Sequence, residues 1–377
     1  MSSPVSTPAP APPARGPSDP RPPAEAAGVP ARLLPGHART AWLFALCLAA
    51  MLMAGLLAVV IGSVSIPPRA VVELLLNRLT GLTTSVVYPA SYSTILFDIR
   101  LPRVVFAAVT GAALAAAGAA YQGLFRNPLA DPYLAGVAAG AGLGATLALT
   151  FNLTNTFLGL SAVPILAFLG ALVTVGLVMA SAQVGRTMPI TTMLLAGVAV
   201  GAFASAVTTL LMLRTPEGLR RAFNWLLGGA TSAGWEPVWI VLPYVAVGLI
   251  VLMLHARALN ILQLDEEQAR QLGLNVERVK LTLVLAATLM TAAVVAFGGL
   301  IGFVGLVAPH MLRLLAGPDY RRLLPLTVFG GAAFLIAADL LARTVLAPQE
   351  LPVGVVTALV GAPFFIFLLR RLKRSVF

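Results

Sequence analysis

The side chains that most often carry catalysis or bind metals are few and scattered in this chain. Its three histidines are His37, His255 and His310, and its one cysteine is Cys47. Three dispersed imidazoles do not form a metal-binding or acid-base cluster, and a lone cysteine cannot form an intrachain disulfide. The residues therefore give no support for an enzyme, and neither a cofactor nor a metal is expected.

The residues that would hold nucleotide phosphates are also missing. The sequence contains no GxxxxGK[ST] motif, and neither of its two lysines, Lys280 and Lys373, follows a glycine. The apolar stretches contain almost no ionisable groups, so a proton relay is not indicated either. His310 follows Pro309 and is either a path-lining group or a structural, hydrogen-bonded histidine. Any energy for work must come from another protein.

The longest hydrophilic stretch between apolar runs, residues 256–280, has the features of a folded unit. Asp265 is a good N-cap with Gln268 as its capping-box partner, and Glu266 suits the first turn of a helix. Gly273 is placed to end that helix in a left-handed conformation, and Asn275 can start the next one. A simple connection would need only a few polar residues, so two short capped helices indicate a rigid knob that meets a cytoplasmic partner. An ordinary solvated helix is the alternative.

Three arginines stand near the opposite ends of the apolar runs. Arg100 and Arg103 flank Pro102, and Arg343 follows Asp339 at the helical i,i+4 spacing. Positive charge on the translocated side runs against the usual orientation bias, so such arginines need partners. Those partners are lipid phosphates, an internal carboxylate, or acidic groups of a docking protein.

The elements that position these residues are predicted to be membrane-spanning helices. Of the 377 residues, 59% are apolar and only 10% are charged, whereas soluble domains have roughly 25% charged residues. Apolar runs of about 20 residues suit helices rather than barrel strands. We expect an all-α polytopic bundle of about ten spans, near 41–62, 101–124, 133–151, 163–182, 190–213, 237–255, 279–299, 301–316, 323–346 and 353–370.

The basic residues indicate the orientation of this bundle. Ten spans put both termini on one side, and a cytoplasmic location for them places 17 of the 25 basic residues inside, including the cluster at residues 370–374. The net charge of +11 thus reflects topology and not nucleic-acid binding. Residues 1–40 are rich in proline and are expected to form a disordered cytoplasmic tail, followed by a transmembrane domain over 41–377.

Small residues recur four positions apart in several spans, which favours close and static packing between helices. The sets are Gly136, Gly140 and Gly144; Gly197 and Gly201; and Gly298 and Gly302.

Five ordered motifs together resemble the permease family of ABC importers for iron-siderophores, heme and cobalamin. They are RLPR at 100–103, GLFRNPLADP at 123–132, ARQLG at 269–273, GFVGLVAPH at 302–310, and ELPVG at 350–354 followed by GAP at 361–363. The likeness extends over about residues 41–370, and five motifs in order are far more specific than any one of them.

The resemblance implies a type II ABC importer permease of ten helices in a bacterial inner membrane. Its partners would be a second permease copy, two cytoplasmic ATPase subunits and a periplasmic or lipid-anchored binding protein. By this resemblance the coupling helices occupy about 258–280, and their ATPase contacts are Leu264, Asp265, Glu266, Glu267, Ala269, Arg270, Gln271, Leu272 and Gly273. Residues matching Arg100, Arg103 and Arg343 would dock the binding protein.

The expected function is the import of an iron-siderophore, or of heme or cobalamin, by alternating access. The path should be lined by weak apolar and small polar groups, with Gln122, Asn127 and His310 as candidates. The alternative is a secondary transporter of a small solute driven by an ion gradient, which would place acids or broken-helix carbonyls near the midplane. The sequence does not distinguish among the chelates.

Overall fold

The computed structural model describes residues 36–62, 64, 66–81, 88–153, 161–229 and 234–374. Residues 1–35, most of the expected disordered tail, lie outside this range. The last five residues of that predicted tail, 36–40, belong to the first helix instead.

Within the described residues the fold is entirely helical apart from one isolated β-bridge between Val184 and Thr187. The elements are α1 Gly36–Val60, α2 Pro68–Thr80, α3 Ala90–Thr94, the π-helical η1 Ile95–Arg100, α4 Leu101–Leu124, the 3₁₀ turn η2 Pro132–Ala135, α5 Val137–Thr150, α6 Ala162–Ala182, α7 Ile190–Met212, α8 Pro216–Leu226, α9 Glu236–Leu254, α10 Ala256–Ile261, α11 Glu266–Gln271, α12 Val276–Gly298, α13 Val304–Ala316, α14 Tyr320–Thr344 and α15 Val353–Arg374.

The predicted bundle of about ten spans is confirmed. Among the described residues seven helices are long and apolar enough to cross a membrane, and α5, α13 and part of α15 form shorter apolar helices. Each of the ten predicted ranges corresponds to one of these helices. The eighth range, 301–316, begins later than expected, because Phe303 adopts a left-handed conformation (φ +67°) directly before α13.

Two regions differ from the predicted pattern. First, the helix that contains the second span does not start at Leu101 but runs without interruption from Ala90 to Leu124. Pro102 lies in the first turn of α4, directly after the π-helical turn η1. Second, α2 and α8 were not expected, because both are short and amphipathic and so fail a criterion based on apolar length.

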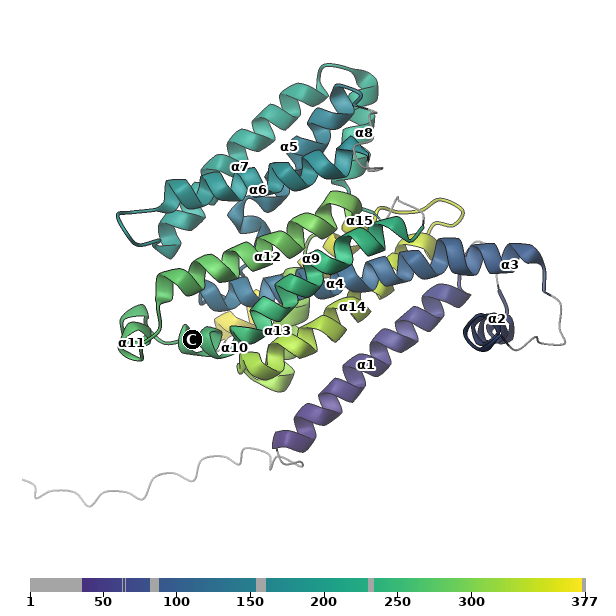
Figure 1. Ribbon diagram of the computed structural model, residues 1–377, viewed down its shortest axis with the longest axis horizontal. Coiled ribbons are helices and arrows are strands. Elements are labelled where there is room, and N and C mark those ends of the chain that lie inside the picture. Colours follow the sequence, from purple (N-terminus) through teal and green to yellow (C-terminus); the bar gives the residue numbers. More distant parts are fainter. Residues whose placement is uncertain are drawn as a thin grey trace, which may run out of the picture.

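Helix α4 is the centre of the bundle and is buried along nearly its whole length. It packs against α12, α13 and α14 (Figure 1). Gly111 of α4 meets the backbone of Gly331 in α14, and Gly118 meets the backbone of Gly305 in α13, so closely that an added Cβ at either position would overlap the partner's carbonyl. These glycines therefore bring three helices into direct backbone contact.

Helices α5, α6 and α7 form a second group beside this centre (Figure 1). Gly140 of α5 contacts the backbone of Gly170 in α6, Gly144 contacts Leu166 of α6, and Gly197 of α7 contacts the backbone of Leu134. The predicted close packing at Gly140, Gly144 and Gly197 is thus confirmed, whereas the same prediction for Gly302 is wrong, because nothing lies within 4 Å of an added Cβ there. Helix α7 presents large apolar side chains such as Phe203 to the outside, as expected for a lipid-facing or subunit-facing surface.

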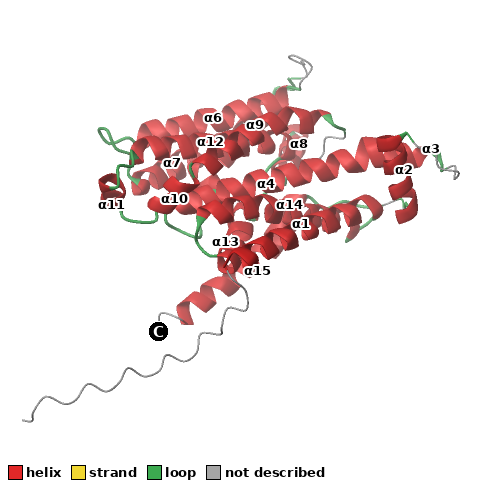
Figure 2. Ribbon diagram, turned by 60° about the horizontal axis from the view of Figure 1, so that its bottom comes forward, coloured by secondary structure: helices red, strands yellow, loops and turns green. Residues whose placement is uncertain are grey.

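The polar connections gather at the two ends of the bundle. Helices α10 and α11 lie at one end, and α2 and α3 lie at the other (Figures 1 and 2). The long helices run between these ends, so the two groups of polar residues singled out in the sequence are separated by the thickness of the apolar bundle.

Candidate functional site

The segment that connects α9 to α12 forms the predicted knob. Asp265 is the N-cap of α11, and its side chain accepts a hydrogen bond from the N–H of Glu266 (2.8 Å). Gly273 has φ +83° after the end of α11, and Asn275 caps α12 by accepting from the N–H of Arg278 (3.1 Å). Both helix starts and the left-handed stop that the sequence indicates are present, but the predicted capping box with Gln268 is not, because Asp265 accepts from Glu266 instead.

Ion pairs fix α11 to the start of α12. The Nζ of Lys280 lies 2.9 Å from Glu266 and 3.5 Å from Glu277, and Arg270 lies 3.2 Å from Glu277. Lys280 also donates to the carbonyl of Met188 (3.0 Å), two residues before α7 begins, and is itself buried. The knob is thereby bound to two neighbouring helices at once.

A further arginine joins the knob to the end of α4. Arg126 donates to the carbonyl of Leu264 (3.2 Å) and lies 3.6 Å from Asp265 and 3.9 Å from Glu266. Arg126 has a positive φ of 51° and belongs to the turn that follows α4. A displacement of the knob would therefore act on α4, the central helix, through this turn.

The predicted contact residues of the knob divide into an inner and an outer set. Ala269 is fully buried, and Glu266 and Arg270 take part in the ion pairs described above. The outer side presents Glu267, Gln271 and two apolar side chains, Leu264 and Leu272, and Leu272 is 63% exposed. The outer side of the knob therefore presents apolar as well as polar side chains to the outside.

The three predicted arginines meet at the opposite end of the bundle. Arg100, Arg103 and Arg343 line one cavity of about 210 Å³, together with Glu350. Arg103 pairs with Asp339 (3.0 Å) and with Glu350 (2.9 Å). Three guanidinium groups thus face two carboxylates, and the cavity keeps a net positive charge.

Two of these arginines are buried and hold the end of α1. Arg100, 5% exposed, donates to the carbonyls of Val59 (2.6 Å) and Val60 (3.0 Å) and to that of Val64. Arg343, 8% exposed, donates to the carbonyl of Ala58 (3.1 Å). These carbonyls belong to the last turn of α1 and the residues after it, where unpaired oxygens and the helix dipole favour positive charge. Both side chains therefore stabilise the position of α1.

Asp339 is the internal carboxylate that the spacing with Arg343 indicates. Its Oδ2 lies 3.0 Å from Nε of Arg343, although the angles are not those of a hydrogen bond, and its Oδ1 accepts from Nε of Arg103 at 3.0 Å. Asp339 is almost completely buried between the two guanidinium groups. The Asp339 carboxylate is thus a counter-charge for both arginines. The sequence could indicate only its pairing with Arg343.

The three candidate path residues have different surroundings, although the N–H of Asn127 donates to the carbonyl of Gln122 (3.1 Å). Gln122 is fully buried and donates to the carbonyls of Gly305 and Leu306 (both 3.3 Å), which ties α4 to α13. Asn127 is exposed in the turn after α4, where its Oδ1 accepts from the N–H of Leu129 (2.9 Å). His310 is 6% exposed and neither ring nitrogen has a hydrogen-bond partner among the described residues.

A buried polar network that the sequence did not indicate lies beside Gln122. Arg313 donates to Oε1 of Gln122 (3.3 Å) and to the hydroxyl of Tyr320 (2.6 Å). Asn260 accepts from the N–H of Tyr320 (2.9 Å) and donates to Asp319 (2.6 Å). The only sequence signal is Asp319 as an N-cap, because the other contacts join residues from separate helices.

Comparison with known proteins places this geometry in a family. Residues 49–371 match the model of the FecCD transport family. The chain belongs to the FecCD transport family. Only residues 1–48 and the last six residues lie outside the matched range. The match therefore includes both the knob and the arginine cavity.

Curated relatives share the sequence over most of their length. The ABC transporter permease protein YvrB of Bacillus subtilis is 42% identical over 83% of this chain and 89% of the relative. The cobalamin import permease BtuC of Halobacterium salinarum is 42% identical over 75% of each chain, and the hemin transport permease HmuU of Yersinia pestis is 39% identical over 74% and 84%.

A solved structure has the same fold. It is described as an inward-facing conformation of a metal-chelate type ABC transporter, and it superposes with a TM-score of 0.76 at 28% identity, over 88% of this chain and 99% of the other. Together with the family match, this shows that the chain is a multi-pass membrane protein and a permease of the ABC-importer type.

Proposed function

We propose that this permease carries an iron chelate of the siderophore class across a bacterial inner membrane, using ATP hydrolysed by separate subunits. The relatives are named for cobalamin, hemin, iron(III) dicitrate and iron(III) hydroxamate, all of them large metal complexes, and heme or cobalamin are the other candidates. The observation that carries the proposal is the rigid, capped knob with an exposed apolar tip in a chain of this family.

The knob is the proposed contact with the ATPase. Leu264, Glu267 and Leu272 form its outer side and would enter a cleft on the partner, while Glu266, Arg270 and Lys280 keep it rigid. Rigidity is required here, because a flexible loop would absorb the movement of the ATPase instead of transmitting it. The knob lies on the cytoplasmic side in this proposal, together with both termini.

The arginine cavity is the proposed contact with an external binding protein. Arg103 has the accessible guanidinium, since Arg100 and Arg343 also hold the end of α1. A carboxylate of the binding protein would compete with Glu350, which is half exposed, for Arg103. The buried Arg100 and Arg343 would then add positive electrostatic potential to the cavity.

Transport would follow alternating access between two copies of this chain around a central path, with two ATPase subunits on the cytoplasmic side. The central helices α4, α13 and α14 would move as a unit because their backbones are in direct contact at the glycines. The route from ATPase to path would run from the knob through Arg126 to α4.

The test uses proteoliposomes that contain the permease, its ATPase and its binding protein, loaded with ATP. Leu272→Ala combined with Glu267→Gln should lower ATP-dependent uptake by at least tenfold, with no change in the folded fraction of the purified permease. A matched control is Leu285→Ala, which removes an exposed leucine in the middle of α12, away from the knob. Full uptake by the knob variant, or uptake driven by an ion gradient without ATP, would refute the proposal.

A further inference from the structure

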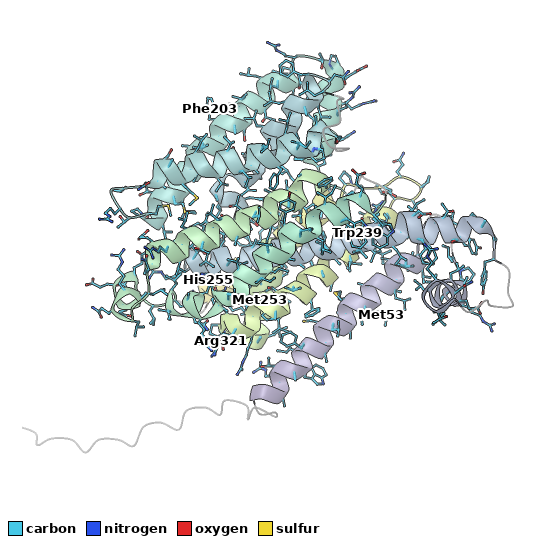
Figure 3. All side chains as sticks on the ribbon, viewed as in Figure 1. Met53, Phe203, Trp239, Met253, His255 and Arg321 are labelled. Atoms are coloured by element: carbon cyan, nitrogen blue, oxygen red, sulfur yellow. The ribbon has the colours of Figure 1, made fainter. Side chains whose placement is uncertain are left out.

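A second polar cavity lies at the same end of the bundle as the knob, on a lateral face of the bundle. It has a volume of about 460 Å³ and lies where α9 bends into α10, beside the first turn of α14. Its polar lining includes Arg257 and Arg321, and its apolar lining includes Met253, Leu254 and Leu324. Figure 3 labels Met253, His255 and Arg321 at this end of the bundle.

The two arginines of this cavity are available to bind an anion. Both are exposed, and within the described residues neither guanidinium forms a hydrogen bond or an ion pair. The nearest acid, Asp319, accepts hydrogen bonds from Asn260 (2.6 Å) and from the backbone N–H of Arg321 (3.0 Å). Burial raises the pKa of the Asp319 carboxyl, but these hydrogen bonds and the charges of Arg321 and Arg322 outweigh burial and lower it. One ionised carboxylate near three arginines leaves the region positive.

The apolar wall of the cavity continues into a surface that suits lipid. Leu254 is 76% exposed, and Met253 beside it is also exposed. At the other end of α9, Trp239 is 63% exposed, in the position of an interfacial aromatic anchor (Figure 3). Along α9, Trp239 and Leu254 are 15 residues apart, about 22 Å at 1.5 Å per residue, which is most of the ~30 Å hydrocarbon thickness of a bilayer, and Arg257 follows in the first turn of α10. The arginines therefore lie at the level of lipid headgroups.

We propose that this cavity binds the headgroup of an anionic phospholipid. The phosphate would be held by Arg257 and Arg321, whose planar guanidinium groups match phosphate oxygens, and an acyl chain would lie along the exposed Met253 and Leu254. A soluble phosphate would use the arginines alone, so the exposed apolar wall favours a lipid. The proposed orientation of the permease places this lipid in the inner leaflet.

A neighbouring cavity shows what distinguishes the proposed site. It has a volume of about 320 Å³ between the end of α6 and the start of α12 and is lined by Arg186, Arg278 and Glu277. It offers two arginines at the same end of the bundle, but the carboxylate of Glu277 belongs to its lining and would repel a phosphate. Arg186 and Arg278 therefore provide a matched control for the effect of surface charge.

The lipid site is connected to the proposed coupling region by α10. Arg257 lies in the first turn of α10, and Asn260 in the same helix holds Asp319 and the N–H of Tyr320. Four residues separate α10 from α11, the outer helix of the knob. A bound headgroup would therefore restrain the inner helix of the knob, which leads to α11.

The experiment measures lipid binding to the purified full-length permease in neutral detergent, by native mass spectrometry and by thermal unfolding. Phosphatidylglycerol should bind and stabilise, and phosphatidylcholine should bind at least tenfold more weakly. Arg257→Gln with Arg321→Gln should weaken phosphatidylglycerol binding about 25-fold, or about fivefold for each arginine, which corresponds to ~1 kcal/mol per basic residue. Arg186→Gln with Arg278→Gln should change it less than twofold.

Three results would overturn the proposal. If both double arginine variants lost phosphatidylglycerol binding equally, the binding would reflect a general effect of surface charge. Equal binding of the two lipids would show that the phosphate charge plays no part. Competition by glycerol 3-phosphate at the same concentration as the lipid would show a site for a soluble phosphate. None of these measurements requires the ATPase or uptake, so they fail or succeed independently of the proposed transport function.

Discussion

The knob and the arginine cavity are both networks of charged side chains, yet they differ in how deeply the charges are buried. In the knob, Arg270 and Glu266 are partly exposed, and pairs of this kind contribute about 0–1 kcal/mol each. In the cavity, Asp339 and Arg343 are almost completely buried. Removal of one partner from a buried pair costs about 3–5 kcal/mol. The cavity therefore fixes the structure through buried pairs, while the knob keeps its shape through helix caps and ion pairs around Lys280 and leaves its tip free for a partner.

The largest expected effect is a loss of stability when a buried charge of the arginine cavity is removed. Asp339→Asn leaves Arg103 and Arg343 without their shared buried charge, and we expect a loss of about 3–5 kcal/mol in the free energy of unfolding. Glu350→Gln, at the exposed edge of the same cavity, should cost less than about 1 kcal/mol. Unfolding in detergent checks both variants. Equal stabilities would show that burial does not distinguish the two carboxylates.

The next effect concerns Lys280, the one buried cation of the knob network as described here. Lys280→Met leaves the carbonyl of Met188 without its donor and removes one counter-charge from Glu266 and Glu277, which keep their pairs with Arg270, so we expect a loss of about 1–3 kcal/mol, confined to the knob. Hydrogen exchange should become faster in α11 and stay slow in α4. Arg270→Gln is the exposed control and should have the smaller effect; faster exchange throughout the bundle would contradict a local role.

A smaller effect is expected at the left-handed stop of α11. Nothing lies within 4 Å of an added Cβ at Gly273, so Gly273→Ala would introduce backbone strain only, about 1–2 kcal/mol. Gly273→Asn should be milder, because asparagine adopts this conformation more readily. Thermal unfolding and ATP-dependent uptake should both rank the variants glycine, asparagine, alanine. An alanine variant equal to the native chain would show that the stop can relax.

The smallest expected effect is a change in the affinity of the arginine cavity for the binding protein. Glu350→Gln removes the exposed competitor for Arg103, so the affinity for the binding protein should rise by a few fold. Surface plasmon resonance with the immobilised permease measures this change. A decrease in affinity would show that Glu350 itself contacts the binding protein and that Arg103 does not. Gln349→Ala, at the neighbouring position, serves as the control.

The sequence predicts the features that depend on neighbouring residues. The ten spans follow from apolar length, and the caps at Asp265 and Asn275 and the stop at Gly273 follow from local backbone chemistry. Asp339 and Arg343 could be paired in the same way, because one helical turn separates them.

Contacts between distant segments could not be predicted. Arg100 was a docking candidate, but its guanidinium meets the end of α1 about forty residues earlier in the chain. The link from Arg103 to Asp339 joins residues 236 positions apart. Gln122 was expected along a path, but its amide is used between α4 and α13. In each case the partner is set by helix packing, which a single sequence does not reveal without related sequences to compare.

The glycine contacts of α4 restrict how the length of this helix can vary. Gly111 meets α14 and Gly118 meets α13, seven residues apart on the same rod. One inserted residue between them would rotate one contact by about 100° and shift it by ~1.5 Å, which would put a bulkier side chain against a backbone carbonyl. Related chains should therefore tolerate insertions and deletions in their connecting loops but conserve the number of residues between these two positions.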